Sequence, residues 1–100
     1  MIEYTSSLID NVKNVKYEEF VDNKILIEAC VFELLQLGEL SGKVTEDFKR
    51  DNTDIPWAEM KGLRNKVVHD YVGVQLHIIW NTIKKDIPEL DKKLRSSLMQ

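Results

Sequence analysis

The segment from Lys24 to Ser41 constrains the fold more than any other part of the sequence. Its apolar residues are spread around most of a helical circumference, whereas a surface helix would confine them to one stripe. They are Ile25, Leu26, Ala29, Cys30, Phe32, Leu35, Leu37 and Leu40. Such a helix has to be covered on more than one side, and Gly42 marks its end. We therefore expect a central helix on which the rest of a 100-residue chain is packed.

Three other segments carry apolar residues at the three-four spacing of an amphipathic helix. Residues 2–15 predict a first helix, and residues 56–72 predict one that has Pro56 in its first turn and ends near Gly73. The core-facing stripe of that helix should contain Trp57, Met60, Leu63 or Arg64, Val67 and Tyr71. Residues 76–98 predict the last helix, in which Pro88 should cause a kink or a restart near Asp86.

The connecting segments are short and polar. Residues 17–22 read as a polar connector anchored by Tyr17 and Phe20, with Asp22 or Asn23 capping the central helix. Residues 45–48 predict one extra turn, and residues 50–55 predict a polar loop. No segment has the period of a strand, and only four glycines and two prolines are present. We predict an all-α, up-and-down bundle of four main helices that forms a single domain over residues 1–100.

The charges are distributed unevenly between the two halves of the chain. Residues 1–60 contain six Lys and Arg against thirteen Asp and Glu, and residues 61–100 contain eight against four. The halves therefore carry −7 and +4 within a total of −3. The total argues against a protein coated for nucleic acid. A nucleic-acid or phosphate site, if present, is expected in the second half.

Several classes of protein are excluded by what the sequence does not contain. No apolar stretch reaches the ~18–20 residues of a membrane span, and the amino terminus does not resemble a signal peptide. The single cysteine, Cys30, lies in an apolar run as a core residue, which favours a reducing compartment and a cytoplasmic protein. Two histidines and one cysteine, without a Gly-rich phosphate loop or a spaced pair of carboxylates, predict no metal and no cofactor.

The unusual part of the sequence is the segment from Gly62 to Tyr71, which reads GLRNKVVHDY. On a helix Arg64 and Tyr71 lie almost in line, and Asn65 and His69 form an i,i+4 pair on the adjacent strip. An arginine on the core-facing stripe is costly without a partner. Arg64 should therefore pair with a carboxylate such as Glu39 or Asp70, or face a subunit interface or a ligand. On composition alone the group could equally be an ordinary set of paired surface and packing residues.

Arg64, His69 and Tyr71 match the Arg-x4-His-x-Tyr signature of HepT-like proteins in the HEPN superfamily, which the chain resembles. The resemblance extends over roughly residues 17–98. Its other elements are Leu37-Gly38-Glu39-Leu40, Ile55-Pro56-Trp57, the stretch from Val72 through Trp80, and Ile87-Pro88-Glu89-Leu90. Family members usually carry a longer first helix, so we expect the first helix here to be shortened by about half.

The resemblance implies a toxin of a toxin-antitoxin pair that acts as a metal-independent endoribonuclease. RNA supplies its own nucleophile, the 2′-hydroxyl, so a protein has only to move protons and stabilise the charged phosphorane. His69 would be the general acid or base, Arg64 the phosphate clamp, and Asn65 would orient the imidazole or a phosphate oxygen. Lys61 and Lys66 are candidates for RNA contacts.

The resemblance also implies two protein partners. A homodimer would bring two copies of the motif together, because the reaction needs both an acid and a base. A minimal nucleotidyltransferase antitoxin would neutralise the toxin by transferring AMP to Tyr71. The alternative is a non-catalytic HEPN subunit that presents a substrate to a nucleotidyltransferase, and a plain helical interaction module is a third possibility.

Overall fold

The computed structural model describes residues 1–98, and every regular element in that range is a helix. The elements are α1 (Ile2–Val12), α2 (Tyr17–Val21), α3 (Lys24–Ser41), α4 (Glu46–Asp51), α5 (Trp57–Val72), α6 (Leu76–Asn81), the π-helix η1 (Thr82–Asp86) and α7 (Ile87–Leu98). The predicted all-α class is confirmed. The four main helical stretches are α1, α3, α5 and the continuous run from α6 through α7.

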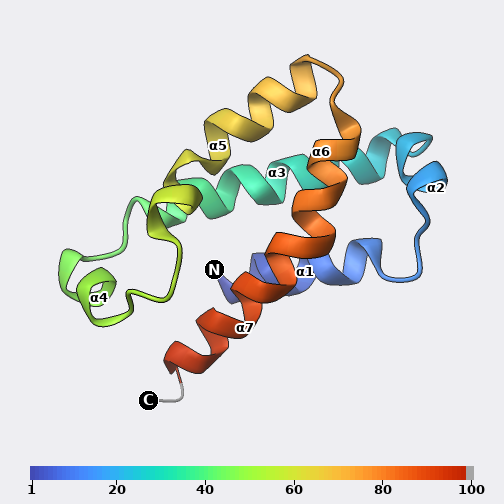
Figure 1. Ribbon diagram of the computed structural model, residues 1–100. Helices are drawn as coiled ribbons and strands as arrows, with labels where there is room; N and C mark the ends of the chain where they lie inside the picture. The colour runs from blue at the N-terminus through green and yellow to red at the C-terminus, as the bar shows by residue number, and fades with distance from the viewer. Residues whose placement is uncertain (99–100) are drawn as a thin grey trace.

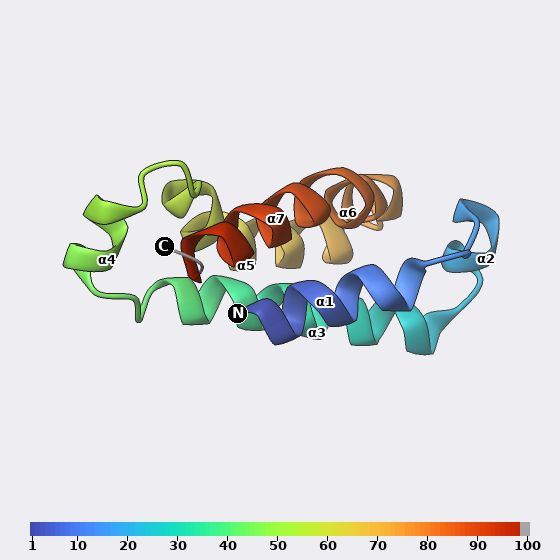
Figure 2. The same cartoon turned by 90° about the horizontal axis from the view of Figure 1, so that it is seen from below.

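The main helices form two layers, which Figure 2 shows edge-on. α1 and α3 lie side by side in one layer, and α5 and the α6–α7 stretch lie in the other. Each main stretch runs back against the one before it in Figure 1, with α2 and α4 at opposite ends of the molecule. The core between the layers is apolar, and Leu8, Phe20, Leu34, Leu37 and Ile83 are fully buried there.

The segment predicted as a polar connector contains a short helix, α2. α1 ends at Val12, three residues early, and the chain turns at Asn14, whose φ is 63°. α2 then begins with a capping box in which the backbone N–H of Lys16 donates to Oε1 of Glu19 at 2.9 Å. Phe20 is completely buried with its ring centroid 4.9 Å from that of Trp80, so the predicted anchoring role of Phe20 is confirmed.

The central helix α3 has the predicted bounds. The Asn23 side chain caps it by accepting the backbone N–H of Leu26 at 3.0 Å. α3 contacts α1, α2 and α5, so the predicted packing on more than one side is confirmed, although Ile25 and Phe32 remain 82% and 55% exposed. Among residues 1–98 no helix, α3 included, is both long enough and apolar enough to cross a membrane.

The second connector also contains more helix than the single turn predicted. Thr45 caps α4 by accepting the backbone N–H of Phe48 at 3.2 Å, and the helix continues to Asp51. The loop that follows is tied to the start of α5, because the indole N–H of Trp57 donates to the carbonyl of Asn52 at 3.0 Å. These contacts fix where α5 begins.

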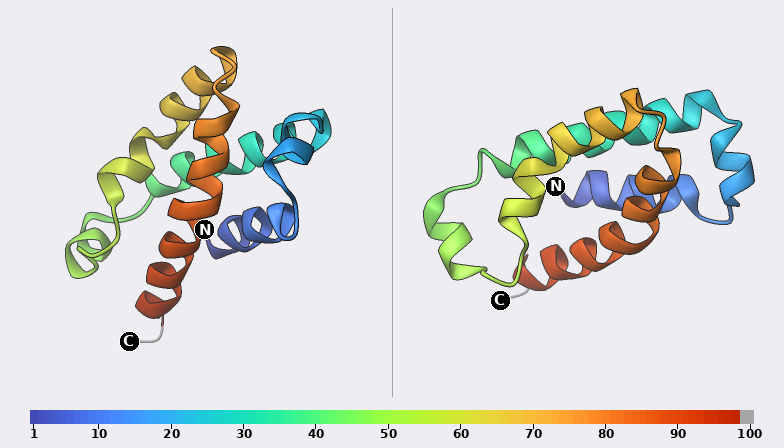
Figure 3. Two further views of the ribbon diagram at one scale, coloured as in Figure 1. Left: turned by 45° about the vertical axis from the view of Figure 1, so that its right-hand side comes forward. Right: turned by 45° about the horizontal axis from the view of Figure 1, so that its top comes forward.

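The last helix bends without breaking, as Figure 3 shows. Pro88 has no N–H to donate, and in the preceding residues the chain adopts the π-helix η1, in which Ile87 donates to the carbonyl of Thr82. The buried residues Ile79, Ile83, Ile87, Leu90 and Leu94 are spaced four, four, three and four residues apart. In an α-helix two successive four-residue steps would rotate the stripe by about 80°. The wider turn of η1 absorbs that rotation and keeps the stripe facing the core.

Candidate functional site

The motif helix α5 buries one face and exposes the other. Its buried residues are Met60, Leu63, Val67 and Asp70, at three-four-three spacing. Of the two residues predicted as alternatives for the stripe, Leu63 faces the core and Arg64 does not, and the prediction of Tyr71 on the stripe is wrong because Asp70 is buried in its place. Adjacent helical residues point about 100° apart, so the side chains of Arg64 and Tyr71 turn toward solvent.

Arg64 is 56% exposed and forms an ion pair with Glu39 of α3, with 2.9 Å between Nε and Oε1. This is one of the two carboxylates that the sequence offered. The other, Asp70, lies on the opposite side of α5 and has different partners. The Glu39 carboxylate is itself 53% exposed, so the pair lies at the surface where α3 and α5 meet.

Gly38 allows the two helices to meet at this point. A Cβ atom at Gly38 would lie 3.0 Å from the backbone nitrogen of Arg64 and 3.2 Å from its Cβ. Both distances are shorter than ordinary van der Waals contact, so any larger residue would push α5 away from α3. The close approach brings the next residue of α3, Glu39, within reach of the Arg64 guanidinium.

His69 is 86% exposed and stands beside a buried carboxylate. Its Nδ1 lies 3.6 Å from Oδ1 of Asp70, whose side chain is only 8% exposed. Nζ of Lys66 lies 3.1 Å from the other Asp70 oxygen and 3.5 Å from Oγ1 of Thr82. His69 therefore lies next to a carboxylate that is already paired with Lys66.

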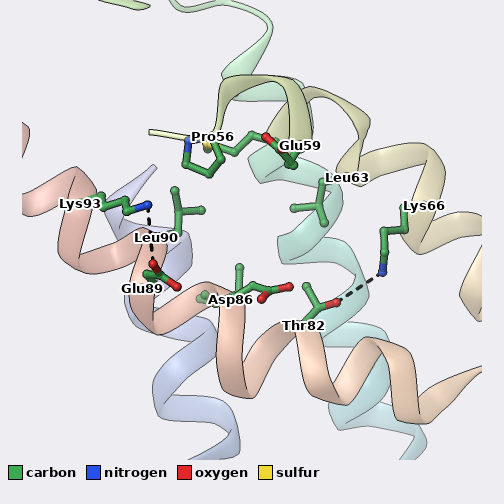
Figure 4. A pocket seen from close by; sticks show the side chains of 11 residues that line it. Pro56, Glu59, Leu63, Lys66, Thr82, Asp86, Glu89, Leu90 and Lys93 are labelled. Carbon is green, nitrogen blue, oxygen red and sulfur yellow. Dashed lines mark hydrogen bonds and ion pairs between the residues drawn. The ribbon is translucent and has the colours of Figure 1, made fainter. Parts of the chain in front are cut away.

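The remaining predicted residues of the motif are exposed. Asn65 lies one turn before His69 on the solvent-facing side of α5, and Lys61 is also exposed. Lys66 is directed instead toward Asp70 and Thr82, and Figure 4 shows its contact with Thr82. The structure thus brings Arg64, Asn65, His69 and Lys61 to the accessible part of the helix surface, while Lys66, which is 50% exposed, is paired with Asp70.

Tyr71 lies in the last turn of α5 and is 37% exposed. The helix ends at Gly73, and the next residue, Val74, has a φ of 57°, a conformation that β-branched residues rarely adopt. Val72 and Val74 are 76% and 73% exposed. Tyr71 therefore lies at the end of α5, next to two exposed valines.

Asp70 is the residue of this region that sequence reasoning misjudged, because it was considered only as a partner for Arg64. The available signal was its position three residues after Val67 on the buried stripe, where a carboxylate has to find a cation. Its actual partner, Lys66, is one turn away on the same helix.

The single cysteine is a core residue, as its place in an apolar run predicts. Cys30 is fully buried, and its burial, with a smaller contribution from Glu33, raises the pKa of the thiol to about 12. Within residues 1–98 no three His, Cys, Asp or Glu side chains are grouped so that they could hold a metal ion.

The motif residues lie outside the groove that borders α5 on its other side. A groove of about 400 Å³ runs between α5 and the η1–α7 stretch, with Met60, Leu63 and Leu90 among its apolar residues. Figure 4 shows Glu59 and Asp86 on its two sides. Arg64, His69 and Tyr71 do not line it, so these three residues lie outside this groove.

Comparison with known proteins identifies similar sequences. The sequence profile of the family described as "Ribonuclease HepT-like" matches residues 1–97. A protein of Caldanaerobacter subterraneus subsp. tengcongensis, provisionally named an RNase, is 39% identical over 93% of this chain and 83% of its own length. One of Methanocaldococcus jannaschii, also provisionally named an RNase, is 33% identical over 94% and 86%. "Probable ribonuclease HepT" of Thermococcus cleftensis is 38% identical over 81% and 74%. No solved structure matches.

Proposed function

Because the chain belongs to the HepT-like ribonuclease family, we propose that it is an endoribonuclease that cleaves RNA with Arg64 and His69. The observation that carries the proposal is the exposure of these two side chains, 56% and 86%, on the one helix that contains the motif. An arginine fork suits two phosphate oxygens, and an imidazole can accept or donate a proton. The proposal also includes an active site shared between two copies of the chain, control through Tyr71, and a role as the toxin of a toxin-antitoxin pair.

The proposed reaction is a transesterification within the RNA. One His69 removes the proton of a 2′-hydroxyl, whose oxygen forms a bond to the adjacent phosphorus. The bond between phosphorus and the 5′-oxygen breaks, and a second acid returns a proton to that oxygen. The products are a 2′,3′-cyclic phosphate and a 5′-hydroxyl. Arg64 stabilises the extra negative charge on the phosphorane, and Asn65 orients the imidazole or a phosphate oxygen.

The placement of the two groups on α5 supports a homodimer. Arg64 and His69 point about 140° apart around the helix, so one copy does not aim both at a single phosphate. Val68, which is 41% exposed, lies between them, about 40° from Arg64. A second copy packed on this surface would cover the valine and bring its own Arg64 and His69 to the same cleft.

Exposed apolar side chains on the neighbouring helix support the same interface. Ile25 and Phe32 are seven residues apart on α3 and share a row with Glu39, which reaches Arg64 on α5. On α5, which packs against α3, Val68 and Val72 are exposed as well. Apolar surface of this kind is what a subunit contact buries. Lys61 beside it would add positive charge to the cleft, and Lys66 would do so from its contact with Asp70.

Tyr71 is the proposed site of control by a minimal nucleotidyltransferase antitoxin, which would make the protein the toxin of a toxin-antitoxin pair. The phenolic oxygen would attack the α-phosphorus of ATP, lose its proton and displace pyrophosphate. Tyr71 lies about 20° from the line of Arg64 and about 10 Å further along the helix axis. An adenylate there would place a phosphate within reach of the Arg64 guanidinium and repel RNA.

The cleavage proposal is tested with purified protein and a labelled RNA in EDTA. We expect cleavage to persist in EDTA and to leave 2′,3′-cyclic phosphate ends. His69→Ala and Arg64→Ala should each lower the rate by about 10²- to 10⁴-fold. The matched controls are His77→Ala and Arg50→Ala, which remove an exposed histidine on α6 and an exposed arginine on α4. Equal rates for motif and control variants, or loss of cleavage on chelation, would contradict the mechanism.

The control proposal is tested with the nucleotidyltransferase, ATP and Mg²⁺. The wild type should gain AMP, detected by mass spectrometry, and lose ribonuclease activity. Tyr71→Phe should keep most of its activity and escape modification, whereas Tyr4→Phe should behave as the wild type. Modification of Tyr71→Phe would assign the AMP to another residue. A protein that accepts AMP but never cleaves RNA would favour the non-catalytic subunit instead.

A further inference from the structure

The ion pair between Arg64 and Glu39 places a negative charge at the proposed phosphate clamp. RNA is anionic, so a carboxylate 2.9 Å from the proposed phosphate clamp should weaken RNA binding by repulsion. Because the Arg64 side chain is itself 56% exposed, it does not need Glu39 to neutralise a buried charge. A carboxylate held here therefore either suppresses the clamp or performs some other task for it.

We propose that Glu39 is a positioning residue that fixes the Arg64 guanidinium for RNA cleavage. The Glu39 oxygen lies beside Nε, the guanidinium nitrogen nearest the helix, so the two terminal nitrogens remain the pair that can meet two phosphate oxygens. A free arginine side chain samples many rotamers, and ordering it has an entropic cost. The ion pair with Glu39 orders the Arg64 side chain before RNA binds, so RNA binding does not have to supply that entropic cost.

The backbone around the pair supports this role. Gly38 brings α3 so close to α5 that a Cβ there would lie 3.0 Å from the Arg64 nitrogen. Glu39 therefore acts from a rigid contact between two long helices, and not from a loop. Arg64 is constrained at its backbone by Gly38 and at its guanidinium by Glu39.

A second Arg–carboxylate pair in the chain provides a control. Arg50 and Asp47 on α4 are also 2.9 Å apart, but both belong to one short helix and are 70% and 81% exposed. The Arg50–Asp47 pair has no part in the proposed site. Asp47→Asn therefore removes a comparable charge from a comparable pair without touching α5.

The inference rests on the proposed ribonuclease function, and its test measures kcat and KM of RNA cleavage for Glu39→Gln. This variant keeps the size of the side chain and removes its charge. We expect kcat to fall by about 10- to 100-fold, the usual effect of a misplaced group, while KM changes by less than about threefold. Asp47→Asn should change neither constant. Glu39→Gln with an unchanged or increased kcat would overturn the inference, since an increase is what a suppressing carboxylate predicts.

A double variant separates positioning from a structural effect. If Glu39 acts only through Arg64, Glu39→Gln should have no effect on the residual rate of Arg64→Ala. A further fall of tenfold or more in the double variant would overturn the inference. Wild-type protein that cleaves no RNA would remove the proposed function together with the role of Glu39, whereas wild-type cleavage that is insensitive to Glu39→Gln would remove only the latter.

Discussion

The α3–α5 contact can be tested by replacing each of two glycines in helix interiors with alanine, in two separate variants. Gly38 of α3 and Gly62 of α5 would both gain helix propensity on replacement by alanine, about 0.5–1 kcal/mol. The added methyl group at Gly62 has no atom within 4 Å, whereas at Gly38 it meets the Arg64 nitrogen at 3.0 Å and the Met60 carbonyl oxygen at 3.4 Å. The atoms it meets are mostly backbone atoms, which cannot rotate away.

The expected free energies of unfolding follow from these distances. Gly62→Ala should be stabilised by about 0.5–1 kcal/mol. Overpacking costs about 1–3 kcal/mol, so Gly38→Ala should be destabilised by about 1 kcal/mol after the gain in propensity. Urea unfolding followed by circular dichroism measures both values. All variants must be compared at the same protein concentration, because a dimer would make stability concentration-dependent. An equal gain in both variants would refute a tight contact at Gly38.

Two further predictions concern strain and buried ionisation. Val74→Gly should raise the free energy of unfolding by about 1 kcal/mol in the same urea assay, because Val74 has a φ of 57° that glycine adopts without strain; a loss of stability would contradict this account. The pKa of the Cys30 thiol is raised to about 12, so the folded protein keeps a proton that the unfolded chain loses near pH 8.5. Stability should therefore fall as pH rises from about 8.5 toward 12, and the fall should be smaller in Cys30→Ala; identical pH profiles would contradict the burial argument.

Local patterns predicted the parts of the fold that depend on local physics. The bounds of α3 and the start and end of α5 follow from apolar spacing, from Asn23 as a cap and from Gly73 as a stop. The helix α2 was not predicted, because five residues are too few to show a period. Its stability depends on Phe20 packing against Trp80, sixty positions later in the sequence.

The candidate site, like the fold, could be predicted from sequence only where local pattern decides the structure. The motif itself is visible as Arg64, His69 and Tyr71, but adjacent helical positions differ by only about 100°, so the pattern alone could not decide between Leu63 and Arg64 as the core residue. The decision depends on how α5 is rotated against α3, which the contact at Gly38 sets. Likewise the engagement of Lys66 with Thr82 depends on packing between α5 and η1.

The π-helical turn gives the chain one residue more than a continuous α-helix would need between Ile79 and Leu94. Deletion of an exposed residue in this turn, such as Lys85, would change the spacing of the buried residues to four, three, three and four. That series is compatible with an uninterrupted α-helix. At this turn, therefore, the removal of one residue leaves the apolar stripe facing the core. A relative shorter by a single residue here can retain the same core, whereas a deletion in the middle of α7 would rotate every later residue by about 100°.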